Sequence, residues 1–542
     1  MPAASTESSL TGSWDLAASR LLSLEGGRQA RDAHSVVALS GVLAGSASVE
    51  DLMKGWPPGH YSAVRAADGE LTLYRDAFGM ARLYYALKEG RVLFATDARA
   101  LPRAGLDAEA ALEAVLSADL DVIFGDLTLH AGVREVPPGE ALVFSRSGLR
   151  RVEARDPYLE PWDTGPSPSP KELRARLSRA VGLAIGGERR VGVALSGGVD
   201  SAMIAAMAAE HLGPGAVTAF TYEFDEPSHP NETPFAALAA KALGIEHRVV
   251  RVAKDAYRAS LPELFRLLEA PRLAPGAWLA MSRALGEAGL ERVLTGDGME
   301  LALSLTEEFE LGGTLGLAAQ SVPWPDLTLK LWKLARFGGW RLRGPGLPGR
   351  FEPPGPTLYH MLLCVLRHNG LISDVGAFYP ASLAATARRA AESPRVRDAV
   401  RAHAADPLDL QLRRHRLRPY YLQRLWRGKQ TAWREAGGAY PVCPALLLEG
   451  APMPRRKHWA NNRELHHMAV EGLVPREILL RKKVTNQSIL PSAWSRDFAA
   501  ELSPKIPAVL AKMSLEGPPA AELSKLFPRE LALLGLWCDH FA

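Results

Sequence analysis

Short apolar runs separated by turn residues fill the first part of the chain. The runs are rich in Val, Leu, Tyr and Phe, and Gly, Asp or Ser bounds most of them, as is typical of strands joined by turns. We predict strands at 35–39, 69–74, 91–95 and 140–144, and one helix at 108–116. Residues 1–155 are therefore expected to form a β-rich domain.

The pattern breaks at residues 156–170, which contain five prolines together with Gly and Ser. Proline fixes φ and removes a backbone N–H donor, so this stretch can continue neither a helix nor a central strand. We predict a Pro-rich linker over 156–170 and a second domain over 171–542.

Strand-like and helix-like segments alternate after the linker. The predicted strands lie at 190–195, 216–222, 247–252 and 292–295, and the predicted helices at 171–185, 202–211, 233–243 and 281–288. This alternation is typical of α/β proteins with a doubly wound parallel sheet. From about residue 355 onward helical patterns dominate, so we expect long helices in a large C-terminal part.

Composition limits the classes of partner. Of 542 residues, 64 are Lys or Arg and 60 are Asp or Glu, which gives a net charge of +4. So small an excess implies neither a nucleic-acid nor a membrane partner, and no apolar run reaches the about 20 residues that a bilayer requires. Three sparse cysteines and no visible secretory signal indicate a reducing, cytoplasmic location.

One glycine-rich turn carries the candidate chemistry. Ser196-Gly-Gly-Val-Asp-Ser201 lies between the first predicted strand of the alternating region and its first helix. Glycines let the backbone approach a phosphate, and a helix start offers N–H groups and a positive dipole end to an anion. Because Asp200 would repel a bare phosphate, we predict a bridging Mg²⁺.

This turn resembles the pyrophosphate (PP) loop of the ATP-dependent, AMP-forming ligases of the asparagine synthetase family. The resemblance continues in Asn231-Glu232, in Leu243-Gly-Ile-Glu-His247 and in Thr295-Gly-Asp-Gly-Met-Glu300. It implies a PP-loop ATP pyrophosphatase fold. It also implies that Asp200 and Glu300 hold Mg²⁺ and that ATP is bound by Leu195, Ser196, Gly197, Gly198, Asp200, Ser201, Tyr222 and Gly296.

Two further residues receive catalytic roles from the same resemblance. The segment from Val474 to Lys483 is similar to the family segment that carries a catalytic lysine, which falls on Lys483. This lysine would offset negative charge that develops during acyl transfer. Asp297 is the candidate acceptor of the proton that the attacking amine loses.

The first domain is similar to the glutaminase domain of class-II amidotransferases. The similarity is carried by Arg75-Asp-Ala-Phe-Gly79, by the segment 94–101 and by Val136-Pro-Pro-Gly-Glu140. It implies an Ntn-type sandwich whose nucleophile is an amino-terminal cysteine. Position 2 is Pro2 and no cysteine occurs before Cys364, so we expect a degenerate domain that releases no ammonia from glutamine.

A synthetase without a working glutaminase must obtain its amine elsewhere. The chain is most similar to lasso peptide macrolactam synthetases, and next to β-lactam synthetases, whose pattern has a tyrosine where this chain has Asp297. The resemblance implies a precursor peptide as substrate, with a leader-binding protein and a leader peptidase as further partners. The alternatives are a β-lactam-type cyclase, an ammonia-dependent asparagine synthetase, and a scaffold that binds nucleotide or peptide.

Several of these residues also have a purely structural interpretation. Asp297 belongs to an Asp-Gly pair that is typical of turns, and Glu300 fits the first turn of a helix. Asn231-Glu232 fits an N-cap followed by an early helix acid.

Clusters of basic residues also have both a functional and a structural interpretation. Lys483 stands beside Arg481 and Lys482, and such a cluster is usually solvated. The segments 330–350 and 413–429 are also strongly basic, and a groove for an acidic peptide is the alternative to a solvated surface there.

Overall fold

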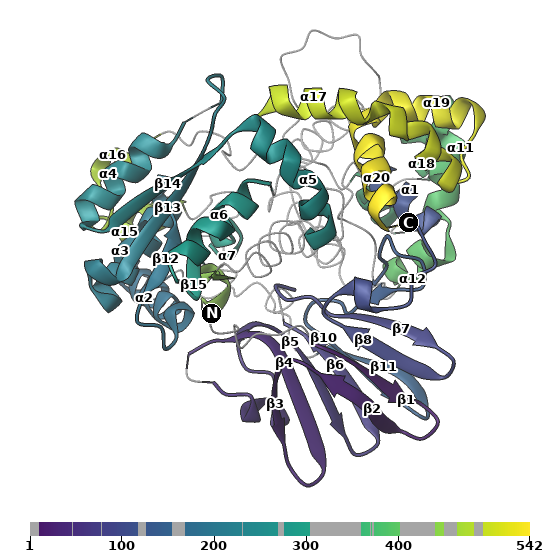
Figure 1. The fold of residues 1–542 in the computed structure, drawn as a ribbon, viewed down its shortest axis with the longest axis horizontal. Helices are drawn as coiled ribbons and strands as arrows, with labels where there is room; N and C mark the ends of the chain where they lie inside the picture. The colour runs from purple at the N-terminus through teal and green to yellow at the C-terminus, as the bar shows by residue number, and fades with distance from the viewer. Residues whose placement is uncertain are drawn as a thin grey trace.

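The computed structural model describes residues 10–45, 47–76, 79–116, 126–153, 168–229, 231–268, 276–303, 359–368, 370, 373–401, 439–448, 463–481 and 491–541. Within these residues the chain forms a mixed α/β fold with three sheets. Figure 1 shows the parallel sheet and its helices on one side, the C-terminal helices on the other, and the two N-terminal sheets below them.

The N-terminal part contains two antiparallel sheets that pack face to face. Their strand orders are β2-β1-β8-β7-β9 and β11-β10-β6-β5-β4-β3. Trp14 and Phe94 of the first sheet share a buried cluster with Leu73 and Phe144 of the second, as expected where two inner faces interdigitate. The strands are β1 Thr11–Asp15, β2 Arg20–Glu25, β3 Arg28–Arg31, β4 Ser35–Leu43, β5 Gly59–Ala67, β6 Glu70–Arg75, β7 Tyr84–Lys88, β8 Arg91–Ala95, β9 Arg134–Glu135, β10 Glu140–Ser145 and β11 Gly148–Glu153.

The strands predicted in this part are confirmed as β4, β6, β8 and β10, and the predicted helix is α1, Ala108–Leu116. The other strands were not predicted. β2 and β3 carry mostly half-buried or exposed side chains, so they lack the apolar alternation on which a strand prediction depends. Two short 3-10 helices, η1 Glu50–Met53 and η2 Ala98–Ala100, occur in connections of this part, and a third, η3 Pro214–Ala216, lies in the parallel-sheet part.

The second sheet system is parallel throughout, in the order β14-β13-β12-β15-β16. The predicted alternation of strands and helices is confirmed, whereas β16 and α5 were not predicted. β16 is only three residues long and contains Pro441, so no pattern could reveal it. The elements are α2 Pro170–Ile185, β12 Val191–Ala194, α3 Val199–Leu212, β13 Val217–Phe224, α4 Thr233–Leu243, β14 Glu246–Val252, α5 Lys254–Leu268, α6 Gly276–Glu287, β15 Arg292–Thr295, α7 Met299–Ala302 and β16 Tyr440–Val442.

Helices cover both faces of the parallel sheet. Val293 and Leu294 are neighbours on β15, yet Val293 belongs to a buried cluster with α5 and α6, and Leu294 to one with α2, α3 and α4. Successive strand residues point to opposite faces, so both faces of β15 are buried. The sheet is therefore doubly wound, and its carboxyl edge is the place where such sheets bind ligands.

From residue 359 onward the described residues are mostly helical, but the helices among them are short. The longest, α20, has 14 residues, so the expectation of long helices was wrong for the described residues. Helix α1 of the N-terminal part packs into the same buried cluster as these helices and lies among them in Figure 1. The helices are α10 Tyr359–His368, η4 Val375–Phe378, α11 Ala381–Ala391, α12 Pro394–Arg401, η6 Pro444–Leu447, α15 Arg463–Val470, α16 Arg476–Leu479, α17 Ser492–Leu502, η7 Ser503–Lys505, α18 Ile506–Lys512, α19 Gly517–Leu526 and α20 Pro528–Phe541.

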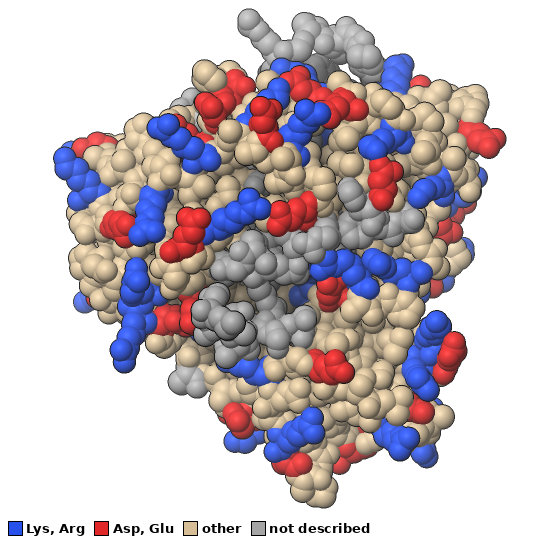
Figure 2. Space-filling view, viewed as in Figure 1, with Lys and Arg blue, Asp and Glu red and all other residues tan. Residues whose placement is uncertain are grey.

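Charge is mixed on the face that Figure 2 shows, where basic and acidic side chains are interspersed among uncharged ones. The basic segments 330–350 and 413–429 lie outside the described residues, and so does most of the predicted linker 156–170. Across the ranges that the structure describes, no helix is both long and apolar enough to cross a membrane.

Candidate active site

The segment from Ser196 to Ser201, here called the PP-loop, joins β12 to α3. Gly198 is the N-cap of α3 in an extended conformation, and no side chain caps the helix. The loop is held by its own hydroxyl groups, because Ser201 Oγ accepts the Ser196 N–H at 3.1 Å and lies 3.0 Å from Ser196 Oγ. The first turn of α3 therefore presents backbone N–H groups without a capping side chain, which suits an anion.

Geometry requires a glycine at position 197 of the PP-loop but not at position 198. Gly197 has φ +70°, and an added Cβ would lie 2.8 Å from the backbone N of Ala236. Around Gly198, in contrast, Ser196 Oγ at 3.4 Å is the one described atom within 4 Å of such a Cβ. Gly197 thus fits the loop against α4, while the space around Gly198 is nearly empty of described atoms, so an anion could come close to the backbone there.

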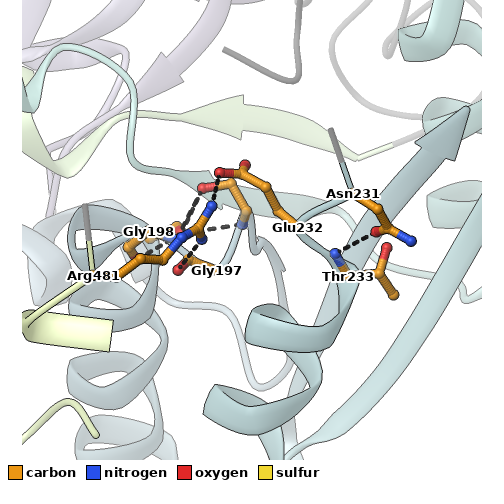
Figure 3. A network of polar contacts seen from close by, with 8 residues as sticks. Gly197, Gly198, Asn231, Glu232, Thr233 and Arg481 are labelled. Carbon is orange, nitrogen blue, oxygen red and sulfur yellow. Dashed lines mark hydrogen bonds and ion pairs between the residues drawn. The ribbon is translucent and has the colours of Figure 1, made fainter. Parts of the chain in front are cut away.

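Arg481, just after α16, fixes the PP-loop to the start of α4 (Figure 3). Its Nη1 donates a hydrogen bond to the Gly197 carbonyl at 3.0 Å, and its Nη2 forms an ion pair with Glu232. The guanidinium also lies 4.1 Å from the ring centroid of Phe235. Only 10% of the Arg481 side chain is exposed, so this residue is not part of a solvated basic cluster. Sequence reasoning missed this role.

The Asn231-Glu232 pair is divided between two roles. Asn231 Oδ1 accepts the Thr233 N–H at 2.8 Å, which satisfies a donor at the start of α4. Glu232 is 8% exposed and holds Arg481. Asn231 therefore bonds a donor at the helix start, but it precedes the N-cap, which is Glu232. Glu232 also forms an ion pair that the sequence did not predict.

Leu195 is held by a hydrogen-bond chain across three strands. Thr221 Oγ1 donates to the Leu195 carbonyl at 2.6 Å and lies 2.9 Å from His247 Nε2. Because the single hydroxyl proton goes to Leu195, His247 Nε2 must be the donor in the second bond. Burial lowers the pKa of His247, which favours the neutral ring. Tyr222 follows on β13, half-buried, with its ring 5.7 Å from that of Phe224.

The second motif meets the PP-loop directly. A Cβ on Gly296 would lie 3.1 Å from the Ser201 backbone N and 3.3 Å from Asp200 Cβ. The motif thus lies against the first turn of α3. Asp297 is half-buried in the turn that follows β15. Glu300 lies in α7, but its side chain is not among the described atoms. The structure therefore brings Gly296 and the PP-loop together, and it leaves the role of Glu300 a prediction.

Asp200 has one close partner in the described part of the chain. His466 Nδ1 lies 3.6 Å from its Oδ1, and 28% of the Asp200 side chain is exposed. Burial lowers the pKa of His466 against the opposing attraction of Asp200, so the ring tends to be neutral. A partly exposed carboxylate in the uncapped first turn of α3 fits Mg²⁺, which ordinarily uses one or two protein carboxylates with phosphate oxygens and water.

Comparison with known proteins matches two families to this chain. Residues 172–299 match the asparagine synthase family, and residues 59–158 match the glutamine amidotransferase domain. Both matches support the resemblance of this chain to the asparagine synthetase family. They also support an ATP-dependent ligase.

Individual relatives are distant. The glutamine-hydrolyzing asparagine synthetase 1 of Bacillus subtilis is 29% identical over 205 residues, which are 38% of this chain and 32% of that protein. The amidase chry2 of Gibberella zeae is 28% identical over 282 residues, which are 47% of this chain and 40% of that protein. The chain thus spans less than half the length of these relatives. A glutamine-dependent NAD+ synthetase from Acinetobacter baumannii shares 16% identity at a TM-score of 0.21, over 53% of this chain and 60% of that one.

The asparagine synthetase resemblance also assigned roles to residues near the C-terminal end. Lys483, the predicted catalytic lysine, lies outside the described residues, whereas Arg481 two positions earlier is described. Arg481 is the last described residue before this gap, and it contacts the PP-loop.

In the glutaminase-like part, the Arg75-Asp76 motif has a structural role. The fully buried Arg75 donates from Nε to the Ala81 carbonyl and from Nη2 to the Gly79 carbonyl, each at 2.6 Å. Asp76 accepts the Ala81 N–H at 2.9 Å. These bonds fold the turn from Gly79 to Ala81, so the motif shapes the scaffold of this domain.

Proposed function

We propose that this protein is an ATP-dependent, AMP-forming amide ligase that closes a macrolactam in a precursor peptide. It activates an Asp or Glu side-chain carboxylate of the peptide and joins it to the peptide's own amino-terminal amine. The observation that carries the ligase part is the contact of Gly296 with the first turn of α3, because it unites two motifs of an ATP pyrophosphatase at one sheet edge.

The reaction has two steps, a nucleophilic substitution at the α-phosphorus of ATP and then one at the acyl carbon. An oxygen of the substrate carboxylate attacks the α-phosphorus of ATP, and pyrophosphate leaves with the electrons of the broken P–O bond. The amine nitrogen then attacks the acyl carbon, AMP leaves, and the amine loses its proton. Across both steps one amide bond forms and ATP becomes AMP and pyrophosphate.

The residues of the site divide these tasks. The N–H groups of the PP-loop and the hydroxyl groups of Ser196 and Ser201 bind the β- and γ-phosphates. Asp297 accepts the amine proton, and Lys483 offsets the charge on the tetrahedral oxyanion and on the leaving AMP. Asp200 and Glu300 would hold Mg²⁺, which stabilises charge on the departing pyrophosphate.

The choice of amine rests on the sequence. No cysteine occurs in the residues before Cys364, so the glutaminase-like part offers no thiol to release ammonia from glutamine. Asp297 stands where β-lactam synthetases have a tyrosine, which favours the macrolactam synthetases. A leader-binding protein and a leader peptidase belong to the same proposal as partners.

The decisive experiment incubates the purified protein with ATP, Mg²⁺ and a candidate precursor peptide. We expect AMP and a peptide that has lost one water, with neither product from the Asp200→Ala variant. A Lys483→Ala variant should slow product formation far more than it weakens ATP binding. Glutamate release from glutamine would contradict the loss of the glutaminase.

Other outcomes distinguish the alternatives. AMP formed with aspartate and ammonia would indicate an asparagine synthetase, and AMP formed with a small β-amino acid would indicate a β-lactam-type cyclase. The relatives from Gibberella zeae and Penicillium rubens are named amidases, so peptide cleavage without ATP would indicate amide hydrolysis. ATP binding without AMP from any substrate would indicate a scaffold.

A further inference from the structure

The glutaminase-like part is bonded to the parallel sheet through His60 of β5. His60 Nε2 accepts the N–H of Cys443 at 3.2 Å, and the His60 carbonyl accepts the hydroxyl of Tyr440 at 2.9 Å. His60 is 1% exposed. One buried residue of the N-terminal sandwich therefore holds both ends of the short segment that contains β16.

The same segment supports the Gly296-Asp297-Gly298 motif from behind. Cys443 Sγ lies 3.3 Å from the hydroxyl of Thr295, the last residue of β15. Gly298 has φ +76°, and a Cβ there would lie 3.1 Å from Leu446 Cδ2 of η6. Both flanks of the motif thus contact this part of the chain, one through Cys443, which lies between β16 and η6, and the other through Leu446 of η6.

These contacts form a continuous path of packed groups. It runs from His60 to Cys443, from Cys443 to Thr295, and from Thr295 into the motif that touches Asp200 and Ser201. The hydrogen bond from the Cys443 N–H to the His60 ring fixes the direction of the Cys443 peptide, and a buried N–H left without its acceptor is costly, so the segment depends on His60.

We propose that His60 is a positioning residue of the ligase site, which holds Gly296-Asp297-Gly298 against the PP-loop through β16 and η6. The glutaminase-like part thereby contributes to amide formation without any chemistry of its own. The catalytic consequence rests on the proposed ligase function, whereas the positioning itself does not.

The chemistry of His60 fits this role. Nε2 must be unprotonated to accept the Cys443 N–H, so the proton of the neutral ring is on Nδ1. Burial is the main cause that lowers the pKa of His60 to about 4, and the nearby Arg292 acts in the same direction. The acceptor is therefore available throughout the neutral range.

Hydrogen exchange followed by mass spectrometry tests the positioning on the full chain. In His60→Leu, which removes the acceptor, we expect amide exchange over 292–303 and 439–448 to rise about tenfold or more. In His60→Gln, whose side-chain oxygen can accept the same bond, exchange should stay near the wild-type rate. Val64→Ala is the matched control, because Val64 is buried on the same strand but packs into the sandwich core.

The outcomes separate the inference from the proposed function. If His60→Leu does not fold, Tyr440→Phe removes the other bond and should raise exchange over the same two segments. Unchanged exchange over 292–303 in a folded variant, or the same rise in Val64→Ala, would overturn the positioning role. In the AMP-forming assay, His60→Leu should lower kcat with little change in the KM for ATP, and His60→Gln should restore it. If the wild-type protein forms no AMP, the proposed ligase function is refuted. The positioning role is then decided by the hydrogen-exchange result alone.

Discussion

Arg481 and Gly197 are joined by a hydrogen bond from guanidinium Nη1 to backbone carbonyl at 3.0 Å, although 284 positions separate them in the chain. The bond fixes the one carbonyl of the PP-loop whose residue has a left-handed conformation. Glu232 holds the other side of the same guanidinium. The shape of the loop therefore depends on the Arg481 guanidinium, which belongs to the C-terminal part of the chain.

Replacing Arg481 should weaken nucleotide binding. Arg481→Met removes both polar contacts and leaves Glu232 buried without its cation. We therefore expect the affinity for α,β-methylene ATP with Mg²⁺ to fall by about tenfold or more. Arg481→Lys should recover only part of this affinity, because an ammonium group cannot make both contacts of the planar guanidinium. Titration calorimetry measures both, with Arg476→Met as control, since Arg476 is exposed on the neighbouring α16. Equal affinity in all variants would contradict the role of Arg481.

Gly197 should not tolerate a side chain. Gly197→Ala places a Cβ 2.8 Å from the Ala236 backbone N at a φ of +70°, so the loop or α4 must shift. We expect a loss of about 1–3 kcal/mol in the free energy of unfolding and no measurable binding of the ATP analogue. Gly215→Ala is the matched control, because a Cβ there meets nothing within 4 Å and its φ is not positive. The prediction is wrong if both variants bind the analogue equally well.

Thr221 should matter through its hydroxyl alone. Thr221→Val keeps the shape but leaves the Leu195 carbonyl without its donor, at an expected cost of about 1–3 kcal/mol in unfolding free energy. Affinity for the analogue should fall as well, since Leu195 leads into the PP-loop. Thr218→Val, on the same strand, removes a bond to the exposed Glu246 and should cost less. Urea unfolding compares the two, and an equal loss would count against the chain from His247 to Leu195.

Stability should fall as the pH is lowered below about 6.5. Burial lowers the pKa of His60, His130 and His360 from 6.5 to about 4. Between these values the unfolded chain binds protons that the folded chain excludes, so the stabilisation is complete above pH 6.5 and is lost progressively toward pH 4. Each histidine contributes up to about 1.4 kcal/mol per pH unit in this window.

Urea unfolding between pH 7.5 and 5 measures this slope above the range in which most carboxylates titrate. His360→Leu should reduce the slope, whereas His34→Gln, which replaces an exposed side chain, should leave it unchanged. A free energy of unfolding that is constant over this pH range would show that these histidines are not buried in the neutral form.

Local pattern determined much of this protein. The apolar runs and turn residues predicted β4, β6, β8 and β10, and the alternation after the linker predicted the doubly wound sheet with bounds close to those observed. The PP-loop was also recognisable, because its glycines, its hydroxyl groups and its place between a strand and a helix are all local features. Strand β16 was not predicted, because three residues that include a proline show no hydrophobic periodicity.

Long-range contacts were decided only by the tertiary structure. Nothing near Arg481 distinguishes a guanidinium that holds a buried loop from one that is solvated, because the difference lies in Gly197 and Glu232, far away in sequence. His60 and Cys443 are 383 positions apart, and neither belongs to a recognisable motif. A hydrogen bond needs two groups within about 3 Å, and hydrophobic periodicity specifies which face of a segment is buried but not which distant group it meets. The sequence by itself thus determined the elements and the chemistry of the loop, while packing decided which residues hold that loop in place.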